Sequence, residues 1–198
     1  MERRNFLKGT AAVIPATIGL QMLMGRGTVF AQSADFKDDV DVLNYALTLE
    51  FLESEFYRQG NSAGVVSGIE AEYLGQIGAD EDAHVTAIST TIKDIGGKPV
   101  AAPKVDFGKA FASRESFLET AHIFENLGVG AYLGAAGFIK EPAILQAAAG
   151  IFGVEARHAA LVGDLLGLEP EGGVYLGATE TPQKKDDVLK AAGPFIKG

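Results

Sequence analysis

The chain of 198 residues carries 17 basic and 26 acidic side chains, which gives a formal net charge of −9 at pH 7. This balance argues against a nucleic-acid partner, because nucleic-acid binding needs a basic face, and it suits metal cations. The chain has no cysteine, which excludes disulfides and thiolate metal sites. Any metal would depend on carboxylates and on the three histidines.

The N-terminal region has the pattern of a twin-arginine export signal. Arg3 and Arg4 precede an apolar stretch over residues 11–23, and a small residue follows at the expected cleavage position. The stretch is too short for a membrane-spanning helix. The pattern predicts a signal peptide at residues 1–31, export by the twin-arginine machinery to the periplasm or another extracytoplasmic space, and a mature domain at residues 32–198 without a stable membrane span. The alternative is a cytosolic protein with an amphipathic N-terminus.

Hydrophobic residues recur at helical spacing in four long segments, which glycines and prolines separate. Ser67 and Glu70 have the spacing of a capping box at the start of the second helix, and Pro142 suits the first position of the fourth. In chain order, the predicted helices span residues 40–57, 67–95, 113–140 and 142 to about 167, with a short amphipathic segment at 184–192.

The connections between the predicted helices differ in length. Short turns join the first helix to the second and the third to the fourth, so each pair should form an antiparallel hairpin. A longer stretch with two prolines, residues 98–112, joins the hairpins. The pattern predicts an all-α four-helix bundle with one long crossover, whereas a cytokine-type bundle would need two.

Two of the predicted helices carry a glutamate and a histidine three residues apart. These pairs are Glu81/His84 and Glu155/His158. Residues at positions i and i+3 project from the same face of a helix, one turn apart, so both side chains of a pair can reach one metal ion. A single pair is weak support for a metal site, but here two of the three histidines belong to one.

The two halves of the chain repeat this arrangement. Glu50 is followed seven residues later by Tyr57, and Glu125 is followed seven residues later by Tyr132. Each half thus has one helix with a central glutamate and one with a Glu-x-x-His pair, which is the ligand inventory of a dinuclear carboxylate bundle. Two divalent cations would balance the four buried carboxylates.

Several segments resemble the ferritin-like domain family: residues 43–57, 81–84, 124–132, 154–160 and the crossover at 99–107. The resemblance covers residues 38–168, and the crossover is similar to that of an exported branch that includes desiccation-related proteins. It implies a ferritin-like four-helix bundle with a dinuclear iron or manganese centre. By position, it implies that one metal is held mainly by Glu50, Glu81 and His84 and the other mainly by Glu125, Glu155 and His158, with Glu81 and Glu155 as bridges.

The leading hypothesis for such a centre is a redox-active metalloprotein with metal ions and small oxidants as partners, which reacts with dioxygen or peroxide as a ferroxidase or a peroxide scavenger. Asp82 stands where a haem-binding bacterioferritin has methionine, so we expect no haem. Two alternatives stay open. The chain could form a homo-oligomer that stores or sequesters metal, or it could be a stress-protective bundle in which the metals only hold the helices together.

Four further residues lie at the edge of the predicted site. Glu53, one turn after Glu50, is the alternative ligand from the first helix. Tyr57 and Tyr132 could donate hydrogen bonds near the metals, although packing alone would also place them in the core. His122, one turn before Glu125, is either a neighbour of the ligands or an ordinary half-buried histidine. Close approach of helices is the simplest explanation for the glycines at positions 128, 130 and 134.

Overall fold

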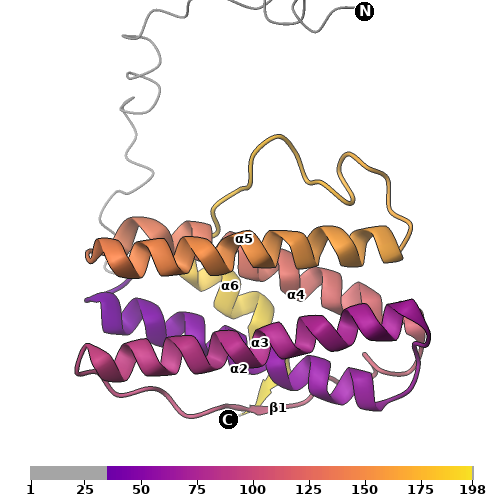
Figure 1. Ribbon diagram of the computed structural model, residues 1–198, viewed down its shortest axis with the longest axis horizontal. Coiled ribbons are helices and arrows are strands. Elements are labelled where there is room, and N and C mark those ends of the chain that lie inside the picture. The colour runs from indigo at the N-terminus through magenta and orange to yellow at the C-terminus, as the bar shows by residue number, and fades with distance from the viewer. Residues whose placement is uncertain (1–34, 198) are drawn as a thin grey trace, which may run out of the picture. The chain divides into compact units, whose positions relative to one another are not determined.

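The computed structural model describes residues 35–197, and five helices form most of this part of the chain (Figure 1). The predicted signal peptide lies outside the described residues. The helices are α2 (Asp39–Ser62), α3 (Ile69–Asp94), α4 (Arg114–Ala135), α5 (Pro142–Leu165) and α6 (Lys185–Ala192), with short 3-10 turns η2 (Ala136–Phe138) and η3 (Gly193–Phe195).

The four long helices form two hairpins that pack on each other. α2 lies along α3, and α4 lies along α5 (Figure 1). The stretch from residue 95 to residue 113 crosses from one hairpin to the other. The predicted all-α ferritin-like bundle with one long crossover and a short C-terminal helix is therefore confirmed. Of the helices described, none is both long enough and apolar enough to cross a membrane.

Local signals explain where most helices begin. The side chain of Asp38 caps α2 by accepting a hydrogen bond from the backbone N–H of Asp41 at 2.9 Å. Pro142 occupies the first turn of α5, as predicted. The predicted capping box at the start of α3 is wrong, because Gly68, with φ of 60°, is the N-cap and offers no side chain. Glu70 instead forms a two-pronged ion pair with Arg114 of α4.

Two helix boundaries differ from the prediction. α2 continues through Gly60 to Ser62 because that glycine makes room for a neighbouring helix rather than ending its own. A Cβ on Gly60 would lie 2.3 Å from Cε2 of Phe117 on α4. At the other boundary, α4 ends at Ala135, and a 3-10 turn replaces its predicted last turn.

The C-terminal segment packs against α4. The backbone N–H of Gln183 donates a hydrogen bond to the carbonyl of Gly130 at 2.9 Å. A Cβ on Gly134 would lie 1.9 Å from the carbonyl oxygen of Gln183. These two glycines therefore admit an extended segment of chain, and not another helix as expected. α6 follows, with Val188 and Ala192 fully buried.

A short two-stranded sheet and an aromatic cluster connect the crossover to the end of the described chain. β1 (Lys104–Val105) pairs antiparallel with β2 (Ile196–Lys197). This pairing brings Phe107 and Phe195 to a ring-centroid distance of 6.2 Å, and Phe195 lies 4.9 Å from Phe124 of α4. Phe56 of α2 belongs to the same cluster. The crossover and the C-terminal segment thus cover one part of the bundle core with aromatic side chains.

Candidate metal centre

All four long helices contribute acidic or histidine side chains to the middle of the bundle. The four glutamates are fully buried, and the two histidines are only 8% and 5% exposed. Isolated charges at such depth would be costly, because the interior solvates them poorly. The residues are Glu50 from α2, Glu81 and His84 from α3, Glu125 from α4, and Glu155 and His158 from α5.

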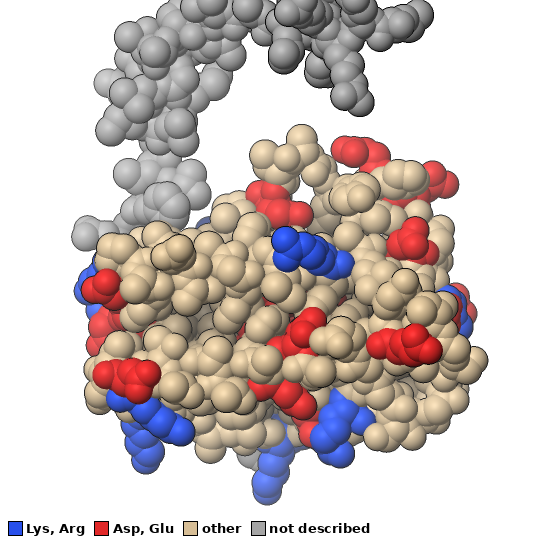
Figure 2. All heavy atoms as spheres, viewed as in Figure 1, with Lys and Arg blue, Asp and Glu red and all other residues tan. Residues whose placement is uncertain are grey.

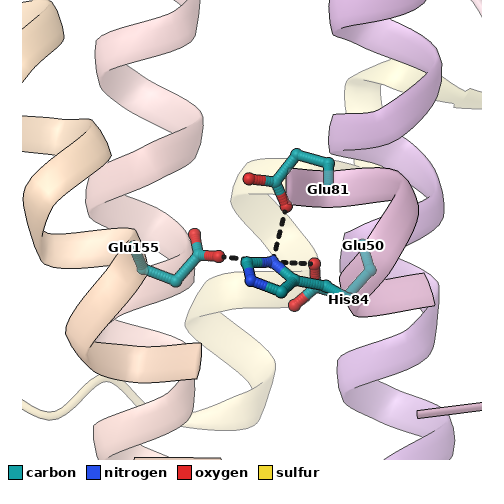
Figure 3. Close-up of side chains that lie close together, drawn as sticks. All are labelled: Glu50, Glu81, His84 and Glu155. Carbon is teal, nitrogen blue, oxygen red and sulfur yellow. Dashed lines mark hydrogen bonds and ion pairs between the residues drawn. The ribbon is translucent and has the colours of Figure 1, made fainter. Parts of the chain in front are cut away.

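One group of four residues surrounds Nδ1 of His84 (Figure 3). This nitrogen lies 3.1 Å from Glu81 Oε2, 3.2 Å from Glu50 Oε2 and 3.2 Å from Glu155 Oε1. One donor atom from each residue lies within 4.8 Å of the others. Helices α2, α3 and α5 therefore converge on one potential metal position.

A second group forms around Nδ1 of His158. This nitrogen lies 3.0 Å from Glu81 Oε1 and 3.3 Å from Glu125 Oε2, and Glu155 completes the group. Glu81 and Glu155 belong to both groups. Glu81 directs Oε2 toward His84 and Oε1 toward His158, as a bridging carboxylate would. The centroids of the two imidazole rings are 6.3 Å apart.

Hydrogen bonds among the donor atoms cannot satisfy all of them, whereas bound metal ions could. An imidazole Nδ1 can donate at most one hydrogen, but three carboxylate oxygens crowd the Nδ1 of His84. Several buried atoms of the cluster have no hydrogen-bond partner within residues 35–197: Glu50 Oε2, Glu81 Oε1, Glu125 Oε2, both oxygens of Glu155 and His158 Nδ1. Cations placed between these atoms would satisfy them together and offset the four carboxylate charges.

Without metal, the cluster must hold protons. Burial alone would lower the pKa of His84, but its contacts with the three surrounding carboxylates raise it to about 12. Contacts with Glu125 and Glu81 likewise outweigh burial and raise the pKa of His158 to about 11. Burial raises the pKa of Glu50 to about 8, although the contact with His84 opposes the rise. Metal binding to the imidazoles must therefore displace protons.

Two tyrosines hold two of the carboxylates from the opposite hairpin. The hydroxyl of Tyr57 on α2 donates a hydrogen bond to Oε1 of Glu125 on α4. In return, the hydroxyl of Tyr132 on α4 donates to Oε1 of Glu50 on α2. Burial, together with the nearby carboxylate charge, raises the pKa of both hydroxyls well above the usual range, so each keeps its proton. The tyrosines therefore act on the cluster and do not only fill the core.

Glu53, the alternative ligand from α2, is buried but belongs to neither group of donor atoms. Burial and the charge of Glu155 raise its pKa well above the usual range. Of the two candidates on α2, the structure brings Glu50 into the cluster.

Gly128 leaves the space in which Glu155 lies. A Cβ on this residue of α4 would lie 2.7 Å from Glu155 Oε2 and 3.2 Å from Glu53 Oε1. Any larger residue would push these carboxylates aside. The role expected for this glycine was close helix approach, but the group that it admits is a carboxylate of the cluster.

His122 lies away from the cluster. Its Nε2 faces Gly163 of α5, because a Cβ on that glycine would lie 3.2 Å from this atom. Burial lowers the pKa of His122, although a hydrogen bond with the backbone of Gly173 opposes the shift. His122 is in neither group of donor atoms, and the structure supports the simpler description of a half-buried histidine.

Asp80 is a residue near the site that the sequence analysis did not single out. Its Oδ2 lies 3.2 Å from Nε2 of His158, on the side of the ring that faces away from the cluster. The only sequence signal is its position directly before Glu81, and this does not show that it contacts a histidine 78 residues away.

Comparison with known proteins agrees with this geometry. The ferritin-like domain family matches residues 38–168. A search of curated proteins finds no significant match. The matched segment contains α2 to α5 and all six residues of the two donor groups. The chain therefore belongs to the ferritin-like domain family.

Proposed function

We propose that this protein holds a dinuclear iron or manganese centre and uses it for redox chemistry with dioxygen or peroxide. One observation carries the proposal: the two groups of donor atoms share Glu81 and Glu155. Two ions held by groups with two residues in common must be neighbours. When bound, such a pair of ions would supply redox chemistry toward dioxygen or peroxide, because two neighbouring ions can share a change of electrons.

The residues divide into three roles in this proposal. Glu81 and Glu155 bridge, Glu50 and His84 complete one metal position, and Glu125 and His158 complete the other. Tyr57 and Tyr132 hold the two outer carboxylates in place through their hydrogen bonds. Carboxylate and imidazole donors without thiolates suit iron and manganese, and the burial of all six residues limits their contact with bulk water.

The test is metal analysis of protein purified from its native compartment, followed by measurement of dioxygen and peroxide consumption. We expect two iron or manganese ions per chain, turnover of one oxidant, and loss of both in Glu81→Gln and His158→Ala. Particles holding hundreds of irons would favour storage instead. Bound ions without turnover would favour a stress-protective bundle, and native protein without metal would refute the proposal.

The proposal includes export through the twin-arginine machinery to the periplasm or another extracytoplasmic space. It rests on the sequence pattern around Arg3 and Arg4. This machinery moves folded proteins, so the metals would be loaded in the cytoplasm. Replacement of both arginines by lysine should leave the protein in the cytoplasmic fraction, and an unchanged distribution would contradict the assignment.

A further inference from the structure

The imidazole of His158 contacts carboxylates on both of its edges. Nδ1 faces Glu81 and Glu125 inside the cluster, whereas Nε2 lies 3.2 Å from Oδ2 of Asp80. A carboxylate beside Nε2 favours a hydrogen on that nitrogen, which leaves the Nδ1 lone pair free for a metal. Asp80 thus sets the tautomer and the orientation that a ligand at this position requires.

Asp80 is itself held in place. Its Oδ1 accepts a hydrogen bond from Nε2 of Gln76, one turn earlier on α3, at 2.9 Å. Its side chain is 37% exposed, so it spans from the protein surface to a buried histidine on α5. Acidic side chains are visible along the seam between α3 and α5 on this face (Figure 2). The Gln76–Asp80–His158 chain therefore connects two helices across that seam.

The other histidine has no such support. Nδ1 of His84 faces three carboxylates, but no group within residues 35–197 hydrogen-bonds to its Nε2. The sequence repeat shows why. When Glu81/His84 is aligned with Glu155/His158, Val154 takes the place of Asp80 and Gly150 takes the place of Gln76. The side chain of valine is apolar and glycine has none, so neither residue can form the corresponding hydrogen bond.

We infer that Asp80 is a positioning residue that makes the two metal positions unequal, so that the ion at Glu125/His158 is held more tightly than the ion at Glu50/His84. This inference rests on the proposed dinuclear centre. Loss of a carboxylate partner behind a metal-bound histidine typically costs about 10–100-fold in metal affinity. Each metal position has one tyrosine hydrogen bond to its outer carboxylate, so these bonds cannot produce the difference in affinity.

The experiment is a calorimetric titration of the metal-free full-length chain with Mn²⁺ alone. We expect two binding steps of unequal affinity, the tighter one absent in His158→Ala and the weaker one absent in His84→Ala. Asp80→Ala should weaken the tighter step by about tenfold or more and leave the weaker step unchanged. Asp80→Glu should restore part of the loss.

Asp82→Ala is the matched control. Asp80 and Asp82 are the two residues next to Glu81 in the sequence. Asp82, however, accepts a hydrogen bond from the Ser54 hydroxyl at 2.6 Å and bonds to neither histidine. Equal losses in Asp80→Ala and Asp82→Ala, or equal weakening of both steps, would mean that Asp80 only supports the fold. Two equal steps in the unmodified protein would overturn the inference and leave the dinuclear site standing. Failure to bind a second ion would overturn both.

Discussion

Tyr57 donates its hydroxyl hydrogen to Glu125, a residue 68 positions later on the opposite hairpin. This bond leaves Glu125 Oε2 turned toward the cluster, 3.3 Å from Nδ1 of His158. The tyrosine therefore determines which oxygen of the carboxylate is available to a metal. Because the bond crosses from α2 to α4, it also fixes the separation of the two hairpins at the level of the site.

We predict that Tyr57→Phe weakens Mn²⁺ binding at the Glu125 position by about tenfold, because the carboxylate loses the donor that orients it. Tyr132→Phe should have the same effect at Glu50. Calorimetric titration measures both. Tyr73→Phe is the control, since Tyr73 is 42% exposed on α3. Affinities equal to those of the unmodified protein would show that these tyrosines only fill the core.

Metal affinity should rise with pH. Contacts with carboxylates raise the pKa values of His84 and His158 to about 12 and about 11, and burial raises that of Glu50 to about 8. These groups hold protons at neutral pH in the metal-free protein, and binding must release them. Each released proton should increase the affinity about tenfold per pH unit.

Titrations in buffers of different ionisation enthalpy would count the protons released. We expect at least one proton per ion below about pH 8, where both imidazoles and Glu50 are protonated without metal. The His84→Ala variant should release fewer protons on metal binding. An affinity that does not change with pH would contradict the protonated state of the metal-free cluster.

Gly128→Ala should disturb the site without replacing any donor. Its Cβ would lie 2.7 Å from Glu155 Oε2, so this carboxylate, which belongs to both donor groups, must shift. We expect fewer than two ions per chain by metal analysis. Gly153→Ala on α5 is the control, because no atom lies within 4 Å of its added Cβ. A full complement of metal in Gly128→Ala would show that Glu155 tolerates displacement.

Gly134→Ala tests how firmly the C-terminal segment is docked. Its Cβ would overlap the carbonyl oxygen of Gln183, at 1.9 Å, so the segment must shift or detach. Crowding of this kind typically costs about 1–3 kcal/mol in the free energy of unfolding, which urea denaturation measures. Gly150→Ala, with no neighbour within 4 Å, should instead stabilise α5 by up to about 1 kcal/mol.

The fold could be predicted because its signals are local. Helical periodicity and short connections define two hairpins, and the long crossover selects the topology. The two residues of each Glu-x-x-His pair could be placed on one face of their helix, because the spacing along a helix determines the direction in which side chains project. The predicted first helix ends at residue 57, before Gly60, because a glycine looks the same in the sequence whether it ends a helix or makes room for Phe117.

The surroundings of the cluster could not be predicted in the same way. The contact between Asp80 and His158 joins residues 78 positions apart, and the space at Gly128 exists only because Glu155 reaches α4 from α5. Such contacts depend on the rotation and offset of packed helices, which sequence spacing within one helix does not specify. Of Glu50 and Glu53, the structure brings Glu50 into a donor group, and the Tyr132 hydroxyl donates a hydrogen bond to it.

The pairing of β1 with β2 also limits the order of assembly. The partners of this small sheet, such as Lys104 and Lys197, are separated by the whole second hairpin and by α6. Contacts between neighbouring helices can form as soon as both helices exist, whereas contacts of large sequence separation form later and more slowly. A growing chain cannot place Phe195 against Phe107 and Phe124 until all four long helices and α6 have been synthesised. The aromatic cover of the bundle therefore becomes available to the folding protein only after its helices.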